Sequence, residues 1–168
     1  RFFYEESERT VTKEVEKQQA QTVTILLLDL DYFKKINDQY GHVIGDFVLQ
    51  KFTNQVKELI RSNDLFGRLG GEEFAILFKD LSLEQSISIA QRICNTVYDT
   101  PIYLDDGRVL NISVSIGLSY QTLPYCIPFQ QLIQRADDAL YQAKEKGRNQ
   151  LCIESTLNAE PILDIEHY

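Results

Sequence analysis

Two acidic residues follow directly on an apolar run near the start of the chain. The run covers residues 22–28, and Asp29 and Asp31 come after it, separated by a leucine. Short, continuous apolar runs are typical of strands buried on both faces, and ligands of α/β sheets usually bind where such strands end. Mg²⁺ often takes one or two carboxylates together with phosphate oxygens of a substrate. The pattern favours a metal site, although a solvated Asp29 and an Asp31 that merely caps a helix would also explain it.

A second acidic pair lies at a glycine turn further along the chain. Glu72 and Glu73 follow two consecutive glycines, between apolar segments 65–69 and 74–78 that we expect to form a β-hairpin. Because glycine has no side chain, a ligand can approach the backbone of this turn while the acids point into the same space. Two glycines at a hairpin tip are ordinarily only a turn, so the hairpin indicates a site only together with other motifs.

The remaining patterns predict the helices and strands that would position these acids. Residues 2–20 are charged and Gln-rich with few apolar positions, which indicates a surface helix. Apolar patterns and capping residues indicate helices at residues 31–40, 44–61, 83–98 and 129–146, strands at 111–120 and 150–153, and a small hairpin around Asp106 and Gly107. We therefore divide the chain into three parts. Residues 1–20 form an N-terminal helix and linker remnant, residues 21–154 form the main domain, and residues 155–168 form a tail without a recognisable pattern.

Composition restricts the class of protein. The 168 residues fit one domain, and a formal net charge of −8 argues against binding a nucleic acid polymer, which requires a concentrated basic surface. No apolar stretch approaches the roughly 20 residues of a membrane span, so we expect no membrane contact by this chain. Cys94, Cys126 and Cys152 are scattered and lack CxxC spacing. They indicate reduced thiols of a cytoplasmic protein, or of the cytoplasmic part of a membrane-anchored one.

Several motifs in fixed order, spread over residues 22–153, resemble GGDEF-domain diguanylate cyclases. The turn Gly70–Phe74 has the GGEEF form of that family's signature. The other matching segments are Asp29–Lys34, Ile36–Asp38, Tyr40–His42, Gly45–Asp46, Ala136–Asp137, Ala139–Tyr141, Ala143–Lys144 and Gly147–Asn149. Motifs that occur together in order are far more specific than any one of them. The resemblance implies an α/β (α+β) fold with a central, mostly antiparallel five-stranded sheet flanked by helices, similar to nucleotidyl cyclases and polymerase palm domains, and makes residues 21–154 the catalytic domain.

The resemblance also implies an activity: two GTP molecules are condensed into cyclic di-GMP, and two pyrophosphates are released. Asp29, the Leu30 carbonyl and Glu72 would hold Mg²⁺ or Mn²⁺, with Glu73 close by. The catalytic residues would be Glu72, Glu73 and Lys34. The attacking 3′-hydroxyl must lose a proton as it displaces pyrophosphate, and a metal ion and a nearby carboxylate both promote this step. The sequence leaves the proton acceptor open.

Asn37 and Asp46 match the residues that recognise guanine in this family, and their chemistry suits that task. A carboxylate accepts hydrogen bonds from the N1 and N2 donors of guanine, whereas adenine would leave it unpaired. His42 lies between them in the sequence and is a candidate contact to GTP. Without the resemblance, a polar helix-end residue and a satisfied loop histidine would be the simpler interpretations of Asn37 and His42.

Three cations and a helix start are expected to bind the phosphates of GTP. Lys34, Lys144 and Arg148 match the family, and the backbone amides near Phe33 and Lys34 would add the positive end of a helix dipole. Phosphoryl transfer depends mostly on such placement and charge stabilisation. Otherwise, Lys144 and Arg148 would be ordinary cations at a helix C-terminus.

Arg61 and Asp64 form an RxxD pattern upstream of the glycine turn, where the family has its inhibitory product site. An arginine fork can hold guanine or phosphate, and an aspartate can accept the guanine donors. Arg92, on the next expected helix, matches a further contact to the product. By itself RxxD is a weak pattern, most often an exposed ion pair at a helix end.

The expected partners follow from the half-site that each domain would present. The reaction needs two domains with their GTP molecules facing each other, so we expect a homodimer and an inactive monomer. We also expect an N-terminal sensor or regulatory domain that this chain lacks. Two rival functions remain: a non-catalytic receptor for GTP or cyclic di-GMP, and another palm-like nucleotidyl cyclase or polymerase. The presence of Asp29, Glu72 and Glu73 together speaks against the receptor.

Overall fold

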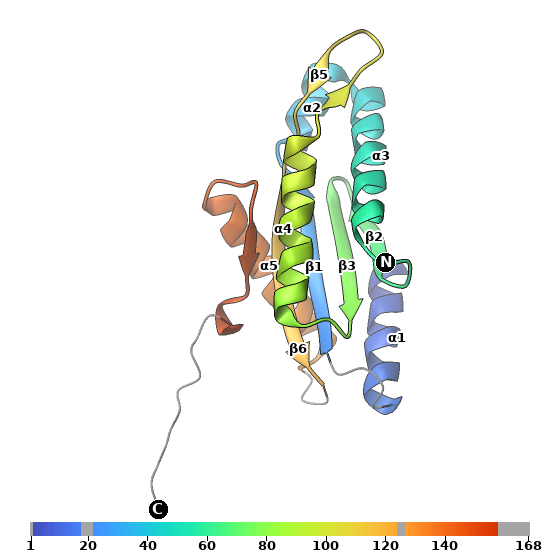
Figure 1. Ribbon diagram of the computed structural model, residues 1–168, viewed down its shortest axis with the longest axis vertical. Coiled ribbons are helices and arrows are strands. Elements are labelled where there is room, and N and C mark those ends of the chain that lie inside the picture. Colours follow the sequence, from blue (N-terminus) through green and yellow to red (C-terminus); the bar gives the residue numbers. More distant parts are fainter. Residues whose placement is uncertain (1, 18–21, 124–126, 158–168) are drawn as a thin grey trace, which may run out of the picture.

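A five-stranded sheet with helices on both faces forms the body of the protein (Figure 1). The structure, a computed structural model, describes residues 2–17, 22–123 and 127–157. The elements are α1 (Phe2–Lys17), β1 (Thr22–Leu30), α2 (Phe33–Tyr40), α3 (His42–Leu59), β2 (Leu65–Gly70), β3 (Glu73–Lys79), α4 (Leu83–Asp99), β4 (Ile102–Tyr103), β5 (Val109–Leu110), β6 (Val114–Thr122), α5 (Phe129–Glu145), β7 (Leu151–Ile153) and a short 3₁₀ helix (Ser155–Leu157). The strand order is β2-β3-β1-β6-β7, in which β7 runs parallel to β6 and the other pairs are antiparallel. The predicted fold class is confirmed.

The central strand β1 is buried on both faces, as its apolar run predicted. Its side chains alternate between two apolar cores. The even-numbered residues face the core shared with α2, α3 and α4: Leu26, Leu28 and Leu30. The odd-numbered residues face the core shared with α1 and α5: Val23, Ile25 and Leu27. Asp29 is also odd-numbered, so its side chain lies on the face of the sheet that α5 covers.

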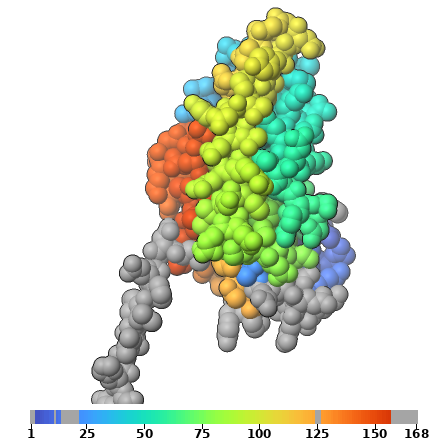
Figure 2. Space-filling model, in the orientation of Figure 1, coloured from blue at the N-terminus to red at the C-terminus, as the bar shows by residue number. Residues whose placement is uncertain are grey.

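Helix α5 packs unusually close to the sheet. In Figure 1 it lies behind the sheet, while α4 lies in front. In the same orientation, side chains of α3, α4 and the β4–β5 hairpin form most of the surface facing the viewer (Figure 2). On the α5 face, Gly117 of β6 has no room for a side chain, because a Cβ there would overlap the backbone of Ala136 and Leu140. This contact lets the middle of α5 lie directly against β6, where Gly117 is paired with Leu27 of β1.

The structure corrects one predicted helix start and shifts several element ends. Asp31 does not cap α2: the N-cap residue is Tyr32, and no side chain accepts a capping hydrogen bond there. The Asp31 carboxylate is instead buried and bonded to residues outside the helix. Gly41, at φ +85°, alone separates α2 from α3, so α3 begins at His42 rather than at residue 44.

Some predictions fall outside the described residues. These concern Cys126, the end of the N-terminal helix at 18–20 and most of the tail. Cys94 and Cys152 are free and buried, and burial raises the pKa of Cys94 to about 12. The boundaries of the main domain at 21 and 154 stay a prediction. None of the helices in the described ranges is long and apolar enough to cross a membrane.

We expect Gly117→Ala to lower the free energy of unfolding by about 3 kcal/mol, because the added methyl group meets rigid backbone and forces α5 away from the sheet. Urea denaturation followed by circular dichroism measures the loss. Gly107→Ala is the matched control. The backbone of Gly107, at φ +85°, is unfavourable for alanine, but open space surrounds the added methyl group. The loss of unfolding free energy should therefore stay at about 1 kcal/mol. Equal losses would mean that α5 yields to the methyl group.

Candidate active site

Residues far apart in the sequence meet at the end of β1. The Asp29 side chain is buried and accepts a hydrogen bond from Lys144 Nζ at 2.8 Å. Lys144 lies in the last turn of α5, 115 residues further along the chain. On the other side, Asp29 is paired in register with Glu73 of β3. The alternative of a solvated Asp29 is therefore wrong, and acids from two strands meet a cation from a helix.

Backbone contacts hold the β2–β3 turn beside Asp29. The Leu30 N–H donates to the Glu72 carbonyl at 3.2 Å, which fixes the turn against the end of β1. Gly71 has φ +53°, a left-handed conformation that glycine adopts readily. Arg68 Nε donates to the Gly71 carbonyl at 2.8 Å and supports the turn from β2. Both predicted turn acids are thus placed next to Asp29.

The acids of this cluster carry more negative charge than its cation offsets. Burial raises the pKa of Asp29, the hydrogen bond and charge of Lys144 lower it, and the charges of Glu72 and Glu73 raise it again. The pKa is raised on balance, so Lys144 does not fully stabilise the ionised carboxylate. A divalent cation would favour the ionised form. The oxygen donors present are of the type that Mg²⁺ and Mn²⁺ bind, so these residues fit the predicted ion.

The cluster is not a complete metal cage by itself. Within the described ranges, no group of three or more His, Cys, Asp or Glu side chains is arranged to hold a metal ion. Mg²⁺ commonly binds through one or two carboxylates and completes its shell with water and substrate phosphates. The arrangement therefore suits an ion that arrives together with a nucleotide better than an ion bound permanently.

Asp31 connects three segments around the site, a role that the sequence analysis missed. Its buried carboxylate accepts hydrogen bonds from Ser113 Oγ at 2.6 Å, Ser115 Oγ at 2.7 Å and the Asn149 N–H at 3.0 Å. The serines lie at the start of β6, and Asn149 lies in the turn after α5. A buried carboxylate requires such partners. The three bonds tie the end of β1 to the turn that carries Arg148.

The predicted phosphate-binding residues lie around the start of α2. Phe33 is buried at the first position of the helix, and Lys34 is exposed in its first turn. The guanidinium of Arg148 lies over the ring of Tyr32, with Cζ 4.8 Å from the ring centroid. Lys144 is held by Asp29. Neither cation is therefore simply a solvated charge at a helix C-terminus.

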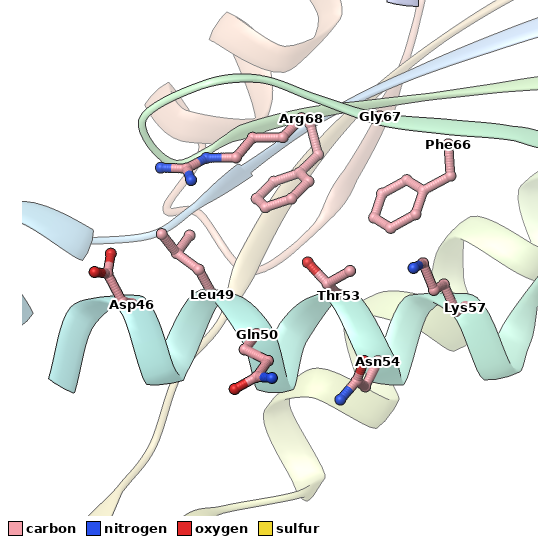
Figure 3. A pocket seen from close by; sticks show the side chains of 10 residues that line it. Asp46, Leu49, Gln50, Thr53, Asn54, Lys57, Phe66, Gly67 and Arg68 are labelled. Atoms are coloured by element: carbon pink, nitrogen blue, oxygen red, sulfur yellow. The ribbon is translucent and has the colours of Figure 1, made fainter. Parts of the chain in front are cut away.

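A groove of about 640 Å³ runs between α3 and the β2–β3 strands (Figure 3). Asp46 and the guanidinium of Arg68 lie at one end, and Phe66 lies at the other. Leu49 and Phe74 add apolar surface, and the rings of Phe66 and Phe74 stack with centroids 5.7 Å apart. An apolar wall with a carboxylate at its edge suits a planar heterocycle that offers hydrogen-bond donors.

The other two predicted nucleotide contacts lie near the Asp46 end of α3. The Asn37 side chain packs over Gly45, where a Cβ would overlap Asn37 Oδ1. Gly45 thus lets α2 and α3 approach each other and brings Asn37 close to Asp46, the next residue after the glycine. His42 is exposed at the first position of α3. Among the described residues, the groove lining includes Asp46 but neither Asn37 nor His42.

Arg68 is a groove residue that the sequence analysis did not identify. It lines the groove across from Asp46 and also supports the glycine turn. The sequence offered one sign of its role, since Arg68 is the one charged residue in the strand sequence LFGRLG. The Arg68 side chain is exposed, and its hydrogen bond to the Gly71 carbonyl holds it at the turn.

The three residues of the predicted product site meet at the C-terminal end of α3. Arg61 Nη2 lies 2.6 Å from Asp64 Oδ1 and donates to the Lys79 carbonyl at 2.9 Å. Arg92 Nη2 donates to the Leu59 carbonyl at 2.7 Å. Helix α3 has 18 residues and is therefore roughly 27 Å long, so this cluster is distant from the Asp46 end of the groove. The ion pair expected from RxxD alone is present, with the Asp64 side chain 1% exposed.

Acids, cations and an apolar groove thus lie on a five-stranded sheet flanked by helices, an arrangement suited to a nucleotide and a metal ion. The family model described as "Diguanylate cyclase, GGDEF domain" matches residues 1–150. The chain therefore belongs to the GGDEF-domain diguanylate cyclase family.

Three relatives illustrate the similarity. The response regulator PleD from Caulobacter vibrioides is 44% identical over 128 residues, which cover 76% of this chain and 28% of PleD. Diguanylate cyclase A from Treponema denticola is 36% identical over 136 residues, which cover 81% of this chain and 36% of that protein. The GGDEF domain of DgcB from Caulobacter crescentus, crystallised in complex with c-di-GMP, has a TM-score of 0.82 at 26% identity, covering 89% of this chain and 86% of that one. The chain spans less than half the length of the curated relatives it matches.

Asp31→Ala is expected to lower the free energy of unfolding by about 2–4 kcal/mol, because the buried Ser115 hydroxyl, the half-buried Ser113 hydroxyl and one backbone N–H lose their acceptor. Chemical denaturation measures the loss. Asp105→Ala, at an exposed aspartate of the β4–β5 hairpin, is the matched control and should change stability by less than about 0.5 kcal/mol. A similar small effect of Asp31→Ala would contradict its anchoring role.

Proposed function

We propose that this chain is the catalytic domain of a diguanylate cyclase, which condenses two GTP molecules into cyclic di-GMP and releases two pyrophosphates. The observation that carries the proposal is the 2.8 Å contact between Lys144 and Asp29, with the charges of Glu72 and Glu73 beside it. Acids and cations that converge from separate elements are what a triphosphate with a divalent ion requires. The family match and the c-di-GMP complex of DgcB support this assignment.

We assign Mg²⁺ or Mn²⁺ to Asp29, the Leu30 carbonyl and Glu72, with Glu73 adjacent. When bound, the ion would polarise the reacting phosphate and neutralise charge on the leaving pyrophosphate. Lys144 is well placed to assist, because its ammonium has three donors and its side chain is 31% exposed. It can contact a phosphate oxygen while it keeps its hydrogen bond to Asp29.

Each half-reaction forms a bond between the 3′-oxygen of one GTP and the α-phosphorus of the other. The bond from that phosphorus to the β-phosphate oxygen breaks, and pyrophosphate leaves. The proton of the 3′-hydroxyl passes to a carboxylate of the glycine turn, Glu72 or Glu73. Lys34, Lys144 and Arg148, with the amides at the start of α2, stabilise the charge on the phosphate oxygens. Two such steps close the cyclic product.

Asp46 and Asn37 give the site its preference for guanine. The carboxylate of Asp46 accepts from N1 and N2 of the base, whose plane lies against the apolar surface of the groove. Adenine has an acceptor at N1 and no amino group at C2, so it would leave this carboxylate unpaired. Asn37 and His42 contact the nucleotide from the junction of α2 and α3.

The complete reaction requires two domains, because each domain binds one GTP and the two nucleotides must face each other. We therefore propose a homodimer, and a regulatory or sensor domain elsewhere in the full-length protein. The cytoplasm is the proposed location, since GTP is available there and the buried Cys94 and Cys152 are free thiols.

The chain, dimerised through a coiled coil fused to its N-terminus, is expected to convert GTP into cyclic di-GMP in the presence of MgCl₂. Glu72→Ala should lower the rate by about 100-fold or more, because it removes an acid that holds the ion and borders the attacking hydroxyl. Glu84→Ala, at an exposed acid in the first turn of α4, is the matched control and should keep the wild-type rate. Liquid chromatography with mass spectrometry quantifies the nucleotides.

Two other outcomes would contradict the proposal. Tight binding of cyclic di-GMP by the dimerised chain without any turnover of GTP would identify a receptor. Conversion of ATP in preference to GTP would identify another palm-like nucleotidyl cyclase or polymerase.

We further propose that Arg61, Asp64 and Arg92 form an inhibitory site for the product. The three side chains meet at the end of α3, and the Arg61 side chain is 41% exposed, so its guanidinium can offer donors to guanine or phosphate. The buried carboxylate of Asp64 holds the guanidinium in a fixed orientation.

Arg61→Ala is expected to raise the concentration of cyclic di-GMP that halves the initial rate by about ten-fold, because a charged hydrogen-bond donor to the product is lost. The rate measured before product accumulates should be retained. Arg108→Ala removes an arginine of similar exposure, whose ion pair with Asp106 lies on the β4–β5 hairpin, and should leave inhibition unchanged. Wild-type inhibition of Arg61→Ala would show that the product acts elsewhere, for example at the active site.

A further inference from the structure

Tyr32, which precedes α2, has a backbone conformation that disfavours a bulky residue. Its φ of 56° and ψ of 25° lie in the left-handed region, where the Cβ crowds the neighbouring carbonyl oxygen and where glycine and asparagine are preferred. The side chain is 53% exposed, so burial of apolar surface does not explain why a tyrosine occupies this position. Some other contact of the ring must account for it.

Two cations lie over the Tyr32 ring. Arg148 Cζ is 4.8 Å from the ring centroid, and Lys35 Nζ is 4.5 Å from it, both within the range of a cation–π interaction. Lys35 belongs to the first turn of α2, whereas Arg148 belongs to the turn after α5. The ring therefore links the end of α5 to the start of α2.

The backbone holds the ring and the guanidinium at this distance. Asp31, directly before Tyr32, accepts the N–H of Asn149, directly after Arg148, at 3.0 Å. Arg148 and Asn149 are also left-handed, with φ of 64° and 47°. In the described part of the chain, three of the four non-glycine residues with positive φ thus flank one hydrogen bond. Such strained residues persist where the surrounding structure determines them, and they concentrate at functional sites.

The contact with the ring leaves the hydrogen-bonding edge of Arg148 open. A guanidinium over an aromatic ring uses its face, while its five N–H donors lie in its plane. Within residues 22–123 and 127–157, no hydrogen bond or ion pair is made by this guanidinium, whereas an acidic partner would have occupied those donors. An oriented guanidinium with available donors, next to the start of a helix, is suited to a phosphate.

We propose that Tyr32 is a positioning residue, whose ring orients Arg148 toward the triphosphate of GTP; this inference rests on the function proposed above. Fixing a long side chain before the ligand arrives removes part of the entropy loss that binding would otherwise require. Tyr32 should therefore affect the affinity for the triphosphate and leave the chemical step and guanine recognition largely unaffected.

The test compares Tyr32→Asn with Tyr32→Phe in the dimerised chain. Tyr32→Asn removes the ring but suits the left-handed backbone, so the Tm should stay equal or rise, while the KM for GTP rises about three- to ten-fold at a nearly constant kcat. Calorimetry with a non-hydrolysable GTP analogue should give the same loss of affinity. Tyr32→Phe keeps the ring face and is expected to restore the wild-type KM and affinity.

Combination with Arg148→Ala separates the possible failures. Arg148→Ala should weaken binding of the analogue, and Tyr32→Asn should add nothing in that background. If Arg148→Ala binds normally, the phosphate-binding role within the proposed function is wrong. If Arg148→Ala weakens binding but Tyr32→Asn does not, or if the two losses add fully, only the role of Tyr32 is wrong. A lower Tm of Tyr32→Asn with a parallel loss of binding would assign Tyr32 a structural role and likewise overturn the proposal.

Discussion

The architecture of the site depends on two carboxylates that are buried where β1 ends. Strand alternation places Asp29 on the α5 side, with the odd-numbered apolar residues of β1, and Asp31 follows two positions later. Burying a carboxylate is unfavourable unless charged or hydrogen-bonding partners replace water. Lys144 donates a hydrogen bond to Asp29, and two serines and the Asn149 amide donate to Asp31. Because these partners lie on β6 and around the end of α5, the bonds that make the burial possible also fix the cations of the site.

The two carboxylates differ in how fully their partners compensate the negative charge. Asp31 accepts three hydrogen bonds and has a structural role. Asp29 keeps a raised pKa, mainly because it is buried and further because of the negative charges of Glu72 and Glu73, and Lys144 offsets these effects only in part. An acidic cluster of this kind opposes stability and favours a cationic ligand, the usual conflict between stability and activity at a functional site. The close packing of α5 on Gly117 and the two apolar cores supply the stability that the cluster lacks.

Local patterns in the sequence were sufficient for the order of the elements and the acidic ends of β1 and the hairpin, and the family resemblance supplied the fold class. They were insufficient wherever a side chain acts through a distant partner. Asp31 looks like a helix cap, since an aspartate before a helix is the ordinary cap, and its true partners are 82 to 118 residues away. Arg68 differs from its neighbours only in charge, and its role appears once β2 and the glycine turn are folded together. The roles that the family resemblance gives to the site residues, among them Phe33, Lys34 and His42, all stay predictions.

The two halves of the proposed nucleotide site are built in different ways. The half proposed to bind guanine lies on two regular helices, which Gly45 brings together, so its polar groups are fixed by ordinary packing. The half proposed to bind phosphate needs a cation that lies beyond the end of α5 but close to the start of α2. Gly147, at φ +117°, lets the chain leave the helix, and Arg148 and Asn149 continue in left-handed conformations toward Asp31. A relaxed turn would carry Arg148 away from Tyr32. Backbone strain is therefore concentrated where the chain reverses and brings the positive charge of Arg148 to the side proposed to bind phosphate.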